Sequence, residues 1–229
     1  MKKLKINWQQ TSTEFVVIVV GVLAALAVDQ WRDERNDSKT EAEYIGRLRT
    51  DIEADIENFY GFEQILETKA RFLQSLLDDT INSEFEHDPR GLMEAVQYSS
   101  FIALPDSVST TFDELQSTGR LALIQDVAQR DALSKYYSGF SHISAILAEP
   151  RGNYRQLLWG TVPGAISRDW RLSNNISGAD DLRHSLALLQ ANPDVPAALN
   201  NEITYAAIMQ YYLVMYRNQA EKLLPSLNQ

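Results

Sequence analysis

Apolar residues follow helical spacing along most of this chain, and one uninterrupted apolar run lies near its start. Residues 15 to 28 read FVVIVVGVLAALAV, fourteen positions without a polar side chain. Beyond that run, two interleaved apolar sets recur at intervals typical of a long amphipathic helix with a coiled-coil-like seam. The first set, every seventh residue, is Ile45, Ile52, Phe59, Leu66 and Leu73, and the second is Leu48, Ile56, Phe62, Ala70 and Leu76.

Helix start and stop signals divide the rest of the chain into shorter helices. Examples are Asp88 before Pro89, a capping box formed by Asp126 and Gln129, and a terminating Gly119. The predicted helices cover residues 88–101, 109–118, 126–148, 154–159, 180–192 and 194–224. No segment alternates with period two, so we predict an all-α protein whose later helices form a bundle.

The flanks of the apolar run are typical of a membrane anchor. Fourteen residues are fewer than the ~20 of a usual span. However, Trp8 and Trp31 bracket the run as interfacial aromatic residues do, and a helix between them would be about 35 Å long. We therefore predict a basic and polar tail (1–13), a transmembrane helix (14–31), a long amphipathic helix (32–80) and a soluble helical bundle (81–229).

A cleaved signal peptide is the alternative interpretation of the same region. Lys2, Lys3 and Lys5 form a basic segment before the apolar run, and Ala25-Leu26-Ala27 resembles a cleavage site. We favour the uncleaved anchor because Glu14 abuts the apolar run and because the residues after Ala27 continue a helical pattern.

Small residues mark one face of the predicted membrane helix. Glu14, Ile18, Gly21, Ala25 and Val28 share that face because they follow 4-3-4-3 spacing. Gly21 and Ala25 form a small-xxx-small pair, the pattern that lets two helices approach closely in lipid. This predicts a homo-oligomer in which the Glu14 carboxylate lies at an interface. The alternative is that Glu14 simply reaches headgroup water.

Two stretches resemble a large uncharacterised bacterial family of single-span proteins. They are EFVVIVVGVLAALAVDQWRDER (14–35) and TFDELQSTGRLALIQDVAQRDALSKYY (111–137). The resemblance implies an anchor followed by a helical domain and implies no activity. Asp29 departs from the pattern, since many relatives carry Asn there.

The same resemblance places the anchor in a bacterial inner membrane. Three basic residues lie close to the apolar run on each side, so their count does not set the orientation. The C-terminal flank of the apolar run is net acidic, and large domains translocate largely regardless of charge. Both facts favour an N-terminus on the cytoplasmic side. We expect a single-pass protein with a periplasmic domain.

The composition of the chain excludes several classes of partner and of chemical site. The net charge of −10 argues against nucleic acid as a partner, and the lack of cysteine excludes disulfides and thiolate chemistry. His87, His142 and His184 are far apart in sequence, so we predict no catalytic residue, cofactor or metal site. The long helix also carries an acidic face, which we interpret as a solvated surface, with a cation site as the alternative. Its residues are Asp51, Glu53, Asp55 and Glu57.

One region is a candidate ligand groove, beside a loop rich in Gly and Asn. Its residues are Arg151, Arg155, Trp159, Arg168 and Trp170, and the arginines would bind a carboxylate or phosphate.

The sequence is compatible with three functions. The first is a membrane-anchored, non-enzymatic, oligomeric interaction or scaffold protein with the bilayer and further copies of itself as partners. The second is an ion-conducting or tension-sensing oligomer with a ring of Glu14 carboxylates. The third is a tethered periplasmic enzyme or small-molecule-binding domain.

Overall fold

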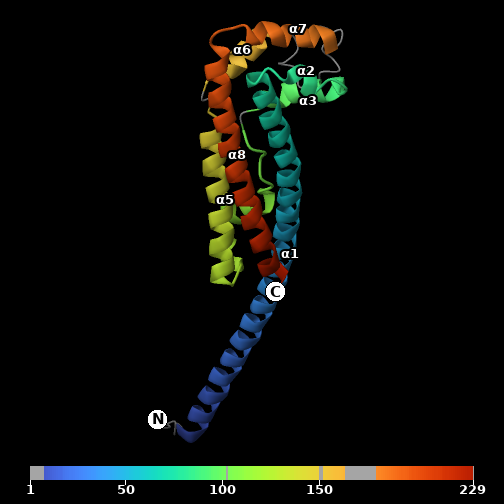
Figure 1. The fold of residues 1–229 in the computed structure, drawn as a ribbon. Coiled ribbons are helices and arrows are strands. Elements are labelled where there is room, and N and C mark those ends of the chain that lie inside the picture. Colours follow the sequence, from blue (N-terminus) through green and yellow to red (C-terminus); the bar gives the residue numbers. More distant parts are fainter. Residues whose placement is uncertain (1–7, 102, 150–151, 163–178, 229) are drawn as a thin grey trace.

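One helix, α1 (Trp8–Leu77), runs through the first third of the chain and organises the molecule. The computed structural model describes residues 8–101, 103–149, 152–162 and 179–228, with the backbone alone for residues 8–14, 16, 179 and 228. The N-terminal part of α1 projects away from a helical body, and its C-terminal part runs the length of that body (Figure 1). Tyr44 is the first buried apolar residue of α1, so the body begins near it.

The remaining helices follow in chain order and assemble around α1. They are α2 (Ile81–Glu84), α3 (Pro89–Ser99), α4 (Thr110–Ser117), η1 (Leu121–Leu123), α5 (Val127–Leu147), α6 (Tyr154–Thr161), α7 (Ala179–Gln190), α8 (Val195–Leu223) and η3 (Leu224–Asn228). The described part of the chain contains no strand, so the all-α prediction is confirmed. The short helices α2, η1 and η3 were not predicted.

The predicted helix signals act as expected at several ends. The Asp88 carboxylate accepts from the Gly91 amide at 2.8 Å at the start of α3. Asp126 caps α5 by accepting from the amides of Ala128 and Gln129 at 2.8 and 3.2 Å, while the Gln129 side chain donates to the Ser226 carbonyl at 2.6 Å instead of completing the predicted capping box. Gly119 has a φ of +68°, the left-handed conformation that favours glycine after a helix end.

Helices α1 and α8 form the spine of the body and carry two separate apolar cores. α8 lies alongside α1 and packs against it more extensively than any other pair of elements (Figure 1). The proximal core, nearer the projecting part of α1, gathers residues of α1, α4, α5, α8 and η3, including Phe59, Phe140 and Tyr216. The distal core gathers residues of α1, α2, α3, α6, α7 and α8, including Phe72 and Tyr154.

The seven-residue repeat of the long helix is a buried face, and its partners lie within the same chain. Ile52, Phe59, Leu66 and Leu73 are at most 1% exposed. They pack in the two cores against α8 and the helices around it. The repeat is therefore satisfied within one molecule, and this face of α1 is not free to pair with a second copy.

Candidate functional site

The projecting part of α1 presents a continuous apolar surface. Its large apolar side chains between Phe15 and Trp31 are 37–67% exposed. At the predicted interface positions, Ile18 is 64% and Val28 61% exposed, and a Cβ added at Gly21 would meet nothing within 4 Å. The side chains of Trp8 and Glu14 lie outside the described residues, so their predicted roles stay predictions. Within the described residues, no helix is found that has the length and apolarity needed to cross a membrane.

The acidic face predicted on the long helix is not a solvated surface throughout, because Asp55 is 0% exposed. Its Oδ1 accepts from the Val108 amide at 2.6 Å and its Oδ2 from the Tyr136 hydroxyl at 2.8 Å. Burial raises the pKa of Asp55, and the two hydrogen bonds lower it in part. Asp55 thus joins α1 to α5 and to the irregular segment before α4.

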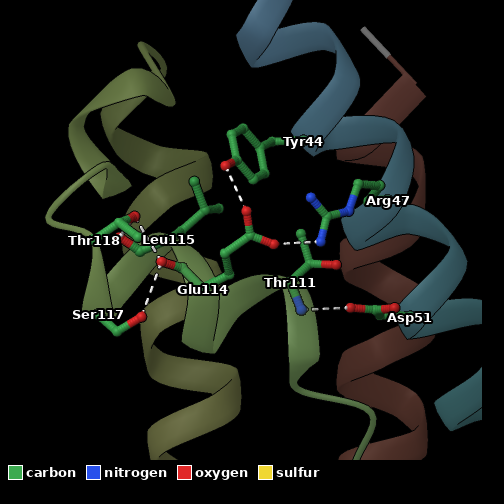
Figure 2. A network of polar contacts seen from close by, with 8 residues as sticks. All are labelled: Tyr44, Arg47, Asp51, Thr111, Glu114, Leu115, Ser117 and Thr118. Atoms are coloured by element: carbon green, nitrogen blue, oxygen red, sulfur yellow. Dashed lines mark hydrogen bonds and ion pairs between the residues drawn. The ribbon is translucent and has the colours of Figure 1, made fainter.

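The start of α4 is held by a neighbouring acidic residue of α1. Ser109 precedes α4 but makes no side-chain cap to it. Instead, the Asp51 carboxylate accepts from the Thr111 amide at 3.0 Å, as Figure 2 shows. Asp51 therefore satisfies an amide that the helix itself leaves without a partner.

The same α1–α4 contact contains an ion pair near the surface (Figure 2). Glu114 of α4 accepts from the Tyr44 hydroxyl at 2.8 Å and from Arg47 at 2.5 Å. The Arg47 and Glu114 side chains are 48% and 40% exposed. These contacts, Arg47 first, lower the pKa of the Glu114 carboxyl.

A buried ion pair separates the two apolar cores. Lys69 of α1 and Glu202 of α8 are joined at 2.5 Å, with their side chains 0% and 11% exposed. The Lys69 ammonium also donates to the Phe101 carbonyl and lies 5.9 Å from the centre of the Tyr205 ring. Burial lowers the pKa of Lys69, and Glu202 raises it in part. On both helices, the proximal core lies on one side of this pair and the distal core on the other.

Two of the five predicted groove residues meet on α6. The Arg155 guanidinium lies 4.6 Å from the centre of the Trp159 ring. Arg155 Nε and Trp159 Nε1 are both buried, and neither has a hydrogen-bond partner among the described residues. Arg151, Arg168 and Trp170 lie outside the described residues, so the groove as a whole stays a prediction.

A groove that the sequence did not indicate lies between α4 and α5. We call it the α4–α5 groove; it measures about 670 Å³ and is lined by the segment 103–109, by α4 and by one face of α5. Its lining includes Ser and Ala of α5 together with Phe112, Tyr137 and Phe140. The small residues along α5 share one helix face, but that spacing alone does not indicate a groove.

No metal-binding group is found within the described part of the chain: no three His, Asp or Glu side chains lie together so as to hold an ion. No known protein family, curated protein or solved structure matches the chain. The resemblance to the bacterial single-span family therefore stays a prediction.

Proposed function

We propose that this chain is a membrane-anchored, non-enzymatic interaction protein, with the N-terminal part of α1 in a bilayer and the helical body at its surface. The observation that carries the proposal is the exposed apolar run from Phe15 to Val28. Moving each such side chain out of water is worth about 1.5–3 kcal/mol, so the run favours an apolar surrounding. The run is about 21 Å long, and Trp8 and Trp31 would extend it into the two interfaces.

The charged groups of the body that bind partners within the fold support a structural role for this part of the chain. Asp51 and Asp55 bind backbone amides, and Lys69 is paired with Glu202. Each of these groups therefore has a partner within the fold. We assign no catalytic role to them, and the partners of the protein would be the bilayer, further copies of itself and other proteins.

We further propose a bacterial inner-membrane location with the body on the periplasmic side. The acidic segment that follows the apolar run supports this orientation, as does the tendency of large domains to translocate regardless of charge. Self-association would take place along the Glu14, Ile18, Gly21, Ala25 and Val28 face. The buried repeat of α1 is already used within the chain.

Fractionation of cells that express the full chain tests the anchor. We expect the protein in the membrane pellet after alkaline extraction, and the Val20→Asp/Leu23→Asp variant in the soluble fraction. Each central aspartate costs about 2.5–3.5 kcal/mol of insertion. The matched control is Val127→Asp, because Val127 is a 55% exposed valine of the body. Protease added to intact spheroplasts of the same cells should cut the body, because a body on the periplasmic side is accessible to it.

Two results would contradict the anchor. One is wild-type protein in the soluble fraction, and the other is a double variant that resists extraction as well as Val127→Asp does. Protection of the body in intact spheroplasts would reverse the proposed orientation and leave the anchor in place.

A further inference from the structure

We propose that the α4–α5 groove binds a linear aliphatic amine that carries two or more ammonium groups. The proposal is independent of the membrane anchor and concerns the helical body alone. It rests on the shape of the groove, on its hydrogen-bonding groups, on its charge and on its apolar walls.

The shape comes from small side chains on one face of α5. Ser134, Ser138, Ser141, Ala145 and Ala148 follow 4-3-4-3 spacing, so they share a helix face, and all five line the groove. Larger residues at these positions would fill the space. The volume of about 670 Å³ lies in the range of small-molecule sites. The lining residues from Ser134 to Ala148, the residue that follows the end of α5, extend over about 21 Å, which suits an elongated ligand better than a round one.

Several hydroxyl groups in the lining have already donated their hydrogens. Ser134 donates to the Arg130 carbonyl at 2.9 Å, and Ser138 donates to the Ser134 carbonyl at 2.6 Å. Ser109 donates to the Asp113 carboxylate at 2.6 Å. These three hydroxyls therefore offer a ligand their oxygen lone pairs, which suits a ligand that carries hydrogen-bond donors.

The charge of the lining has one sign. Asp106 and Asp113 are both exposed and line the groove, and the described lining includes no Lys, Arg or His. A carboxylate or phosphate ligand would meet only like charge here. A ligand with ammonium groups would instead form charge-assisted hydrogen bonds with the two carboxylates.

Alanine side chains supply the apolar surface of the site that is open to a ligand. Ala103, Ala145 and Ala148 line the groove, and the latter two are exposed. Phe112, Tyr137 and Phe140 also line it but are only 2–4% exposed, so they form a largely covered floor. A chain of methylenes interrupted or ended by ammonium groups matches acceptors, carboxylates and this apolar surface together.

Calorimetric titration of spermidine into the full chain tests this inference. The protein is held in nanodiscs of zwitterionic lipid, because anionic lipid would itself bind the amine. We expect saturable binding that weakens with salt, and no binding of 1,8-octanediol, which has a similar chain without charge. Asp106→Asn/Asp113→Asn should raise the dissociation constant at least about tenfold, the size of one lost charge-assisted hydrogen bond.

Two further variants separate loss of the site from loss of the fold. Ser141→Leu fills the groove and keeps both carboxylates, so it should abolish binding while the unfolding midpoint stays close to that of the wild type. Asp131→Asn removes an exposed carboxylate of α5 that does not line the groove, and it should bind as the wild type does. The proposal is overturned if spermidine does not bind, if the diol binds equally well, or if the double aspartate variant binds unchanged.

Discussion

Lys69 and Glu202 place a pair of charges between two apolar cores, where each charge depends on the other. The carboxylate and the ammonium are 2.5 Å apart, and the lysine side chain is fully buried. Taking such ions out of water is costly, and their mutual attraction offsets that cost only while both are present. We expect this pair to contribute to specificity, because the pairing requires one alignment of α1 with α8.

Breaking this pair should destabilise the protein much more than replacing it. We expect Lys69→Met to lower the free energy of unfolding by about 3–5 kcal/mol, because Glu202 is left buried without a cation. Lys69→Met/Glu202→Leu should recover most of that loss. Urea unfolding of the full chain, followed by circular dichroism, measures both. A single variant that costs under about 1 kcal/mol, or a double variant worse than the single one, would contradict the argument.

The buried Asp55 carboxyl should make stability depend on pH in an unusual direction for an aspartate. Burial raises its pKa above the ordinary value of 3.8, so the folded state holds the proton more tightly than the unfolded chain. This contribution is complete below pH 3.8 and is lost as the pH rises through the folded pKa. The advantage of wild type over Asp55→Asn should therefore shrink as the pH rises.

Urea unfolding at a series of pH values from about 4 to 8 measures this difference. Asp131→Asn is the matched control, since Asp131 is exposed on α5 and its removal should leave the pH dependence unchanged. A wild-type advantage over Asp55→Asn that grows with pH would show that the two hydrogen bonds to Asp55 outweigh its burial.

At the scale of elements, α4 is held by α1 through one backbone contact and one surface ion pair, and these should differ in strength. Asp51→Ala removes the acceptor of the Thr111 amide and should cost about 1 kcal/mol, as the loss of a helix cap does. Arg47→Ala removes an ion pair whose two side chains are more than a third exposed, so it should cost less. Urea unfolding of the two variants compares them directly, and a larger loss for Arg47→Ala would reverse the ranking.

The sequence was sufficient to place the longer helices, because caps, glycines and prolines act locally, but it did not indicate the short helices α2, η1 and η3. It was insufficient to show what the long helix packs against, because a seven-residue repeat looks the same whether its partner is a second chain or α8. It did contain a signal for the buried charges. Counting three residues on from Ile52 and Leu66 gives Asp55 and Lys69, the core positions of a strict repeat. Ile56 and Ala70 are the apolar residues next to these positions, so the apolar pattern assigned them to the core instead.

The two candidate sites also differed in how far the sequence alone could predict them. The apolar surface of residues 15 to 28 could be predicted because it depends only on consecutive residues. The α4–α5 groove could not, because it needs the segment 103–109 to lie across from α5. That placement is set by contacts between residues far apart in sequence, such as the hydrogen bond from the Val108 amide to Asp55.

At the scale of the whole molecule, α1 is one continuous helix with an exposed apolar part and a part that packs in the body. Its exposed apolar part would lie in the bilayer under the proposed function, and its other part runs along one side of the body beside α8 (Figure 1). The α1 repeat that could have paired with a second copy is used within the chain. Self-association is therefore expected in the projecting part, along the face that carries Gly21 and Ala25.

Cysteine scanning tests that face directly, because the chain has no cysteine of its own. We expect Gly21→Cys and Ala25→Cys to form disulfide-linked dimers in native membranes under mild oxidation. The two small positions share one helix face, and their size lets two backbones approach closely. Leu23→Cys is the matched control, since a residue two positions away points to the opposite side of the helix. Equal yields at all three positions would indicate random collision, and a higher yield at Leu23→Cys would place the interface on the other face of α1.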